Sequence, residues 1–236
     1  SPEQRLQELG HYRQALTRCL DAATPPHARW GHVFAPLAQV IAQHQLPVQL
    51  LHDLISAFEQ DVRHTASGHR YADMAELLAY CRLSANPVGR LLLHLWGVSD
   101  ATALQRSDHI CSALQLVNFW QDLGRDLPRQ RCYLPADALQ RQGLRVEDFL
   151  PDADAPDAAR RAVVADLCAH ARGLMQMGEP LVHQVRGRAG WELRLVVQGG
   201  LRILDKVEAL KGGSLHTRPK LRGWDWCVML GRALVM

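Results

Sequence analysis

The apolar positions of this 236-residue chain recur mostly at intervals of three and four residues, which is the period of amphipathic α-helices. The pattern predicts helices over residues 3–20, 33–44, 48–64, 74–96, 99–127, 136–142, 158–185 and 191–210, and a short turn over 146–150. Pro87 predicts a kink inside the fourth helix, because proline lacks the backbone donor and clashes with the preceding turn. We therefore expect an all-α protein, and we treat residues 1–236 as a single domain.

Turn-forming segments separate several of the predicted helices. Thr24-Pro25-Pro26 ends the first helix, residues 151–156 are expected to form a surface loop, and Gly212-Gly213 caps the helix that ends near residue 210. Gly199 and Gly200 lie inside that helix, where each glycine costs roughly 1 kcal/mol relative to alanine. We therefore expect a packing or cavity requirement at this glycine pair.

A stripe of polar side chains interrupts the apolar sequence near residue 120. Gln115, Asn118, Asp122 and Asp126 follow one another at intervals of three or four residues, so they lie on one face of a helix. Buried carboxylates are costly unless a cation or a metal compensates them. The stripe therefore predicts a hard divalent cation held in a hydrophobic pocket.

A simpler interpretation places Asp122 and Asp126 in solvent, where they would pair with Arg125, Arg129 or Arg131. Two features favour the metal site instead. The stripe extends two turns into apolar sequence, and arginine and tyrosine donors suited to phosphate oxygens follow it at once. Carboxylates, Mg²⁺ and arginine together bind diphosphates, and a diphosphate held this way in a dry cavity can be ionised from an allylic ester.

Charge and cysteine content narrow the class of protein. The 27 basic and 24 acidic residues are interspersed and give a net charge of +3, which does not suggest a nucleic-acid binder. The six cysteines are far apart and include no C-x-x-C pair, so we expect reduced thiols in a cytoplasmic protein. No apolar run reaches the roughly 18 residues of a membrane span. The tail at 222–236 carries Trp224 and Trp226 among few charges, so it either docks on the body or makes a peripheral membrane contact.

Three stretches combine these residue types into motifs. The first spans residues 61–89, the second is N-F-W-Q-D-L-G-R-D at 118–126 followed by R-C-Y-L-P at 131–135, and the third joins 199–208 to Arg218-Pro219. Together they resemble the signatures of the squalene/phytoene synthase family. The resemblance runs essentially from end to end, and it implies an isoprenoid synthase-type helical bundle around a central hydrophobic cavity.

Within that family, residues 84–90 and 118–122 are most similar to the bacterial hopanoid-pathway branch. This likeness implies Mg²⁺-assisted ionisation of presqualene diphosphate and capture of the cation by water to give hydroxysqualene. Head-to-head joining of two farnesyl diphosphates to squalene is the other reaction that the resemblance allows. The alternatives from other classes are a non-catalytic partner subunit or pseudo-enzyme of the same fold, and a helical interaction protein. The intact acidic stripe favours the enzyme.

The resemblance assigns roles to eight residues: magnesium ligation to Asn118, Asp122 and Asp126, diphosphate binding to Gln115, Arg131 and Tyr133, and chemistry at the reacting centre to Tyr80 and Asp61. Tyr80 would act as a proton carrier or cation stabiliser, and Asp61 matches a family acid near the pocket. Without the resemblance, Tyr80 could equally be a core tyrosine, and Asp61 could pair with Arg63 or Arg70.

The resemblance also implies cofactors and partners. Mg²⁺, or Mn²⁺ in its place, would bind with a prenyl diphosphate substrate, and neighbouring pathway enzymes are further partners that it allows. NADPH is not expected, because no G-x-G-x-x-G motif follows a predicted strand.

Three departures from the family pattern qualify these expectations. Gln121 stands where many members have arginine, which should weaken diphosphate binding from that position. Gly200 stands where many members have tyrosine, which could widen the pocket and admit water. The family's first aspartate-rich motif is not found in residues 1–236, so we expect an N-terminally incomplete domain that lacks half of the metal site and is inactive by itself.

Overall fold

The computed structural model describes residues 1–21, 29–150, 153, 156–210 and 215–236. Every regular element in these ranges is an α-helix or a 3-10 helix (η), which confirms the all-α prediction. The elements are α1 Pro2–Cys19, α2 Gly31–His44, α3 Val48–Ser67, α4 Met74–Ser84, α5 Asn86–Leu95, α6 Ala101–Gln121, α7 Leu123–Asp126, η1 Leu127–Arg129, α8 Ala136–Gln140, η2 Val146–Phe149, α9 Asp157–Gly178, η3 Glu179–His183, α10 Gly187–Ala209 and α11 Gly223–Val235. Thr24–Pro26, Gly212-Gly213 and most of the 151–156 loop lie outside the described residues.

Prolines divide two of the predicted helices more completely than expected. The helix predicted over 74–96 becomes α4 and α5, which meet at Ala85, and Pro87 occupies the first turn of α5. The predicted kink is therefore a full break. The helix predicted over 158–185 ends as an α-helix at Gly178, and η3 continues from it with Pro180 at its start. In both places the proline lies in the first turn of a helix. The backbone N–H groups of a first turn have no partner within the helix, so the N–H that proline lacks is not needed there.

The helix predicted over 99–127 is also broken, at Asp122 between α6 and α7. The Asp122 backbone N–H donates to the carbonyls of both Asn118 and Phe119, and its φ and ψ of −104° and 12° leave the helical region. Asp122 and Asp126 therefore do not lie on one continuous helix. The prediction that one continuous helix carries the whole polar stripe is therefore wrong. Both acids nevertheless line the same pocket.

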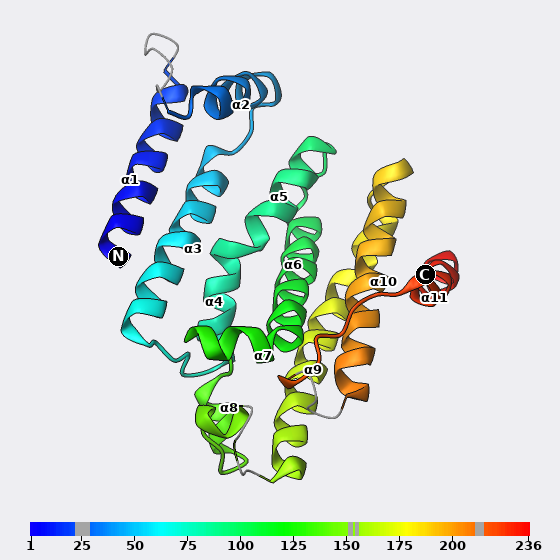
Figure 1. The fold of residues 1–236 in the computed structure, drawn as a ribbon. Helices are drawn as coiled ribbons and strands as arrows, with labels where there is room; N and C mark the ends of the chain where they lie inside the picture. Colours follow the sequence, from blue (N-terminus) through cyan, green and yellow to red (C-terminus); the bar gives the residue numbers. More distant parts are fainter. Residues whose placement is uncertain (22–28, 151–152, 154–155, 211–214) are drawn as a thin grey trace.

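The main core surrounds α6, which lies between the α4–α5 pair and α10 and packs extensively against α9 (Figure 1). Leu116 and Trp120 are among its most deeply buried side chains, and both point into this core. A second, smaller cluster joins α1, α2 and the first half of α3 through Leu16, Phe34 and Ile55. The molecule therefore consists of a large bundle around α6 and a three-helix flank that is carried by α3.

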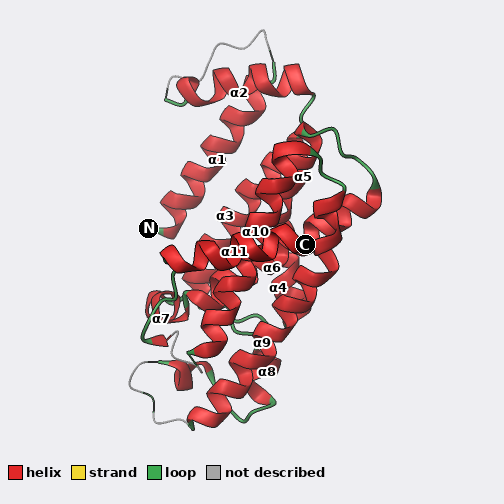
Figure 2. Cartoon of the chain, turned by 90° about the vertical axis from the view of Figure 1, so that its right-hand side faces the viewer, coloured by secondary structure: helices red, strands yellow, loops and turns green. Residues whose placement is uncertain are grey.

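The C-terminal helix α11 docks on α10 (Figure 2). Asp225 is buried, and its carboxylate accepts hydrogen bonds from Arg202 Nε at 2.7 Å and from the Arg222 backbone N–H at 2.6 Å. Lys206 Nζ lies 2.5 Å from the same carboxylate. The tail is therefore docked on the body of the protein. The docking contact uses Asp225, which is the only acidic residue in the tail. No described helix is long and apolar enough to cross a membrane.

The glycine pair in α10 serves helix packing. A Cβ atom at Gly200 would lie 2.7 Å from Leu114 on α6 and 2.9 Å from Met175 on α9, and one at Gly199 would lie 3.3 Å from Met229 on α11. The expected packing requirement is therefore confirmed. Gly200 lies in a packed helix contact and lines neither of the two pockets that surround the site residues, and the pocket-widening role expected of it stays a prediction.

Two glycines of α9 offer a matched test of the α6–α9 contact. A Cβ at Gly178 would lie 2.5 Å from the Ile110 side chain and 2.7 Å from the Arg106 carbonyl oxygen, whereas one at Gly173 would meet nothing within 4 Å. Gly178→Ala should lower the free energy of unfolding by about 1–3 kcal/mol through overpacking. Gly173→Ala should raise it by up to about 1 kcal/mol through helix propensity. Chemical denaturation of both variants measures the difference, and equal stabilities would contradict the described contact.

Candidate active site

A pocket of about 280 Å³ opens between α3, α4, α6 and α7, and we call it the acidic pocket. Its lining residues are Leu54, Ala57, Phe58 and Asp61 from α3, Tyr80 and Ser84 from α4, Gln115, Asn118 and Phe119 from α6, and Asp122, Asp126, Arg131 and Tyr133 from the segment that follows. Residues on α3 and α6 reach it at intervals of three and four, so each helix presents one face. All eight residues assigned from the sequence lie on this one pocket.

Three carboxylates share the acidic pocket, and the structure disfavours ionisation of two of them. Burial raises the pKa of the Asp61 carboxyl above its ordinary value of 3.8, although hydrogen bonds from the Tyr80 and Tyr133 hydroxyls and the charge of Arg131 act in the opposite direction. Burial, and then the negative charge of Asp122, raise the pKa of Asp126. The pocket therefore gathers more negative charge than it neutralises.

The alternative pairing of Asp61 with a neighbouring arginine is not found. Arg63 lies 3.6 Å from Glu59, one turn earlier on α3, and Arg70 donates to the backbone carbonyl of His69. Asp61 instead faces Tyr80 and Tyr133, whose pKa values are raised first by burial and then by the charge of this carboxylate. Both hydroxyls consequently remain protonated and act as donors to Asp61.

Aromatic side chains from α4, α6 and the segment after η1 form one wall of the acidic pocket. Tyr133 stacks on Phe119 with ring centroids 3.9 Å apart and an angle of 8° between the ring planes. Tyr80 lies 6.1 Å from Tyr133 and 6.3 Å from Phe119, and Tyr71 extends the cluster behind them. Aromatic faces attract cations through their quadrupole, so this wall can stabilise positive charge next to the acids.

Arg218 is a residue of the site whose role the sequence did not reveal. Its guanidinium binds Asp122 through two hydrogen bonds, Nε to Oδ1 at 2.5 Å and Nη2 to Oδ2 at 3.0 Å. This bidentate pair is the strongest form of arginine–carboxylate contact. Arg125, which the simpler interpretation paired with Asp122, approaches only to 3.9 Å. The sequence signal was a lone R-P pair far along the chain, and nothing in its local pattern points to residue 122.

Gln121 and Gly124 hold the Arg218 segment in place. The buried Gln121 amide donates to the Pro219 carbonyl at 2.5 Å and accepts from Arg218 Nη2 at 3.3 Å. A Cβ at Gly124 would lie 2.0 Å from the Leu215 carbonyl oxygen, so only glycine permits this close approach. Gln121 does not line the acidic pocket and instead positions Arg218, and the weaker diphosphate binding expected from this position stays a prediction.

The donor set of the acidic pocket suits a magnesium ion. Asn118 offers an amide oxygen and Asp122 and Asp126 offer carboxylate oxygens, which are the ligands that hard divalent cations prefer. The raised pKa of Asp126, caused partly by its neighbour, indicates that a further positive charge would be favourable there. Within the described residues, no group of three or more His, Cys, Asp or Glu side chains is placed to hold a metal ion.

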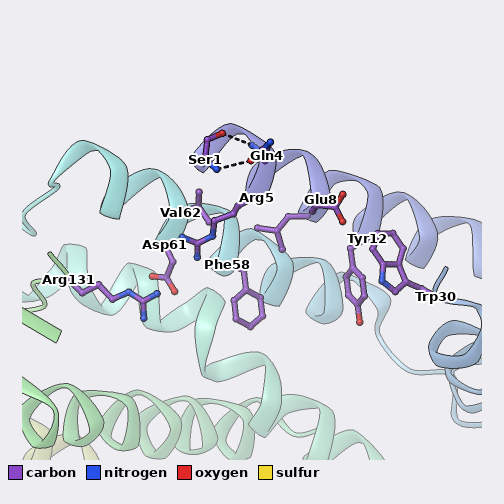
Figure 3. Close-up of a pocket in the computed structure, with 11 residues that line it drawn as sticks. Ser1, Gln4, Arg5, Glu8, Tyr12, Trp30, Phe58, Asp61, Val62 and Arg131 are labelled. Carbon is purple, nitrogen blue, oxygen red and sulfur yellow. Dashed lines mark hydrogen bonds between the residues drawn. The ribbon is translucent and has the colours of Figure 1, made fainter. Parts of the chain in front are cut away.

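Two further cavities adjoin the elements of the site. A cavity of about 620 Å³ lies between α1 and α3 and shares Phe58, Asp61 and Arg131 with the acidic pocket (Figure 3). A third, of about 300 Å³, is lined almost entirely by apolar side chains of α5, α6, η3 and α10, including Leu92, Ile110 and Leu193. It follows α6 toward its N-terminus, so a polar region and an apolar region lie in sequence along one helix.

The six cysteines are all free in the structure, as the sequence predicts. Cys81, Cys132 and Cys168 are buried, and burial raises the pKa of each thiol. They therefore act as small apolar residues of the core.

Comparison with known proteins identifies the family. Residues 1–225 match the squalene/phytoene synthase family model. A hydroxysqualene synthase of Rhodopseudomonas palustris is 35% identical over 187 residues, which cover 78% of this chain and 62% of the relative. A phytoene synthase of Thermus thermophilus is 32% identical over 211 residues, 89% of this chain and 69% of the relative. The crystal structure of squalene synthase HpnC from Alicyclobacillus acidocaldarius superposes with a TM-score of 0.77 at 31% identity, over 86% of this chain and 73% of that one.

The chain therefore belongs to the squalene/phytoene synthase family. It spans 62% of the length of the Rhodopseudomonas relative. The predicted helical fold and the family resemblance inferred from the sequence motifs are confirmed. The roles of the eight pocket residues stay predictions.

The raised pKa of Asp61 predicts a pH-dependent gain of stability on Asp61→Asn. A carboxyl with a raised folded-state pKa favours folding fully only below its ordinary pKa of 3.8, and this contribution is lost as the pH rises through the folded-state value. Asparagine stays neutral throughout, so the free energy of unfolding of the variant should exceed that of the wild type at neutral pH, with the difference shrinking toward acid.

Denaturant unfolding measured from below pH 3.8 to neutral pH tests this expectation. The matched control is Asp166→Asn, whose carboxylate is 62% exposed and should change stability by less than about 0.5 kcal/mol. Parallel curves for wild type and Asp61→Asn would show that Asp61 is not destabilised by its surroundings.

Proposed function

We propose that this protein ionises a prenyl diphosphate in the acidic pocket, with presqualene diphosphate as the substrate and hydroxysqualene as the product. The observation that carries the proposal is the convergence of three acids, two arginines and an aromatic wall on one half-buried pocket. The choice of reaction is supported by the relative from Rhodopseudomonas palustris, which is named hydroxysqualene synthase.

The acidic end of the pocket would bind the diphosphate. Asn118, Asp122 and Asp126 would hold Mg²⁺, or Mn²⁺, which when bound neutralises charge on the leaving group. The Arg131 guanidinium would donate hydrogen bonds to phosphate oxygens. The single Tyr133 O–H donates to Asp61 in this structure and would turn to a phosphate oxygen when the diphosphate binds. Gln115, one turn before Asn118 on the same face of α6, offers a further amide donor.

Arg218 adds a second guanidinium beside the acids. Its pair with Asp122 compensates a carboxylate that would otherwise repel its neighbour Asp126, and the hydrogen bond to that carboxylate raises the pKa of Arg218 further. The guanidinium therefore keeps its charge throughout, next to the position where the diphosphate departs. Because Gln121 holds the segment that carries it, Gln121 contributes to diphosphate binding by positioning rather than by contact.

The aromatic end of the pocket would hold the reacting carbon. The C–O bond to the diphosphate breaks with its electron pair on the leaving oxygen, and the cyclopropylcarbinyl cation rearranges beside the faces of Phe119, Tyr80 and Tyr133. A water oxygen then bonds to the cation and releases its proton to the Asp61 carboxylate by way of the Tyr80 hydroxyl. The Ser84 hydroxyl lines the pocket and has no hydrogen-bond partner among the described residues, so it is free to orient that water.

The apolar cavity along α6 would receive a prenyl chain. Leu114, at its near edge, lies eight residues before Asp122, which corresponds to ~12 Å along the helix axis. Leu92, Ile110 and Leu193 give it the apolar lining that a hydrocarbon chain requires. The diphosphate and its chain would therefore lie along α6, with the charged end at the C-terminus of the helix.

Assay of the full-length protein for diphosphate release from presqualene diphosphate, with farnesyl diphosphate as a second substrate, tests the proposal. Asp126→Asn removes one acid of the site and should lower kcat/KM at least about a hundredfold. The exposed acid variant Asp166→Asn should retain wild-type kcat/KM, and chelation of divalent cations should abolish release in both proteins.

Three outcomes distinguish the alternatives. Product alcohol from presqualene diphosphate supports the proposal, whereas squalene formed from farnesyl diphosphate alone would replace it with the two-substrate reaction. Release from neither substrate by the folded full-length protein would reject catalysis and leave the non-catalytic relative.

A further inference from the structure

The outer face of α11 is an apolar surface that no described part of the chain covers. The helix uses one line of residues, Asp225, Met229 and Ala233, to dock on α10. Its opposite side exposes large apolar residues, namely Trp224 (74% exposed), Trp226 (51%), Leu230 (47%), Leu234 (70%) and Val235 (88%). We call these five residues the α11 outer face.

No charge interrupts the α11 outer face. Trp226, Leu230 and Leu234 follow one another at intervals of four, and Cys227 and Gly231 lie between this line and Trp224 on the helix surface. Arg232, the basic residue of the helix, points aside and pairs with Asp205 at 2.9 Å. A contiguous apolar helix face of this kind on the outside of a molecule marks an interaction site. In Figure 1, α11 is the outermost helix on its side of the bundle.

The surface next to the α11 outer face carries uncompensated positive charge. Lys220 and Arg222 precede the helix, are exposed, and form no ion pair with any described residue. The acids of α10 and α11 are already paired: Glu192 with Arg188, Asp205 with Arg172, Arg202 and Arg232, Glu208 with Arg172, and Asp225 with Arg202 and Lys206. An incoming negative charge would therefore meet two free cations and no free acid in these helices.

Tryptophan, leucine and adjacent basic residues together match one kind of partner. Tryptophan concentrates at the boundary between lipid headgroups and acyl chains, and an amphipathic helix lies in that plane with its apolar face inserted by about 5–10 Å. Anionic headgroups attract lysine and arginine beside such a helix. A second copy of this chain fits less well, because a symmetric contact would bring Lys220 and Arg222 toward their own equivalents with no acid to receive them.

We propose that the α11 outer face binds an anionic lipid bilayer. Trp224 and Trp226 lie at the headgroup level, Leu230 and Leu234 enter the acyl boundary, and Lys220 and Arg222 contact lipid phosphates. The helix stays docked on α10 through Asp225 while it binds, since the residues that dock and the residues that face the lipid are different. This inference stands on the surface alone and is independent of the reaction proposed for the acidic pocket.

Flotation of the purified protein with lipid vesicles tests the proposal. Wild type should float with vesicles that contain phosphatidylglycerol, bind more weakly to vesicles of phosphatidylcholine alone, and lose affinity as salt is added. The double variant Leu230→Ser/Leu234→Ser should bind at least about tenfold more weakly to the anionic vesicles. Lys220→Ala/Arg222→Ala should lose about fivefold for each charge and lose most of the salt dependence.

Matched controls separate lipid binding from folding and from self-association. Met177→Ser alters an apolar side chain of similar exposure, 53%, on α9 and should float like wild type. Circular dichroism and light scattering on each variant report the fold and the oligomeric state. Wild-type flotation by the folded Leu230→Ser/Leu234→Ser variant would overturn the proposal. The proposal would also be overturned if the wild type is a dimer, the Leu230→Ser/Leu234→Ser variant is a monomer, and neither protein binds vesicles.

Discussion

Electrostatic repulsion among clustered carboxylates is the constraint on which this structure depends. Asp61, Asp122 and Asp126 surround a half-buried pocket, and burial raises the pKa of two of them. Such a cluster is tolerated only where cations approach, and the chain brings Arg131 and Arg218 to it from two different segments. Arg131 follows η1 in the chain, and Arg218 pairs with Asp122 where α6 meets α7.

Helix α6 combines the core and the site in one element. Its buried face, with Leu116 and Trp120, anchors the bundle, and its other face presents Gln115, Asn118 and Phe119 to the pocket. The break at Asp122 separates α6 from α7, so Asp122 and Asp126 do not lie on one helix. Both acids line the acidic pocket. Rigid packing on one side thus fixes the donors on the other, which is what a binding site for a charged ligand requires.

The sequence predicted most of the fold and the composition of the pocket, for physical reasons that differ. Helical periodicity located the helices because apolar spacing reports which face is buried. The i, i+3 and i+4 spacing of Gln115, Asn118 and Asp122 predicted their shared face, and the motif resemblance added Asp61 and Tyr80, which local spacing could not connect to α6. In the structure, all eight assigned residues line the acidic pocket.

What the sequence could not predict depends on contacts between distant segments. The break at Asp122 accompanies the approach of Leu215 to Gly124, and the role of Gln121 depends on the position of Pro219, nearly a hundred residues later. Arg218 belongs to the third motif, but nothing in its local sequence connects it to Asp122. Similarly, the tail offered docking and surface contact as alternatives, whereas the structure shows one face of α11 docked and leaves the other apolar face exposed.

The most direct test of the central claim is calorimetric titration of the protein with farnesyl thiodiphosphate, an unreactive analogue, with and without Mg²⁺. If the acidic pocket binds metal and diphosphate together, Mg²⁺ should tighten the dissociation constant at least about tenfold for wild type and for Asp166→Asn, and not for Asp126→Asn. A dissociation constant for wild type that is the same with and without Mg²⁺ would contradict the account.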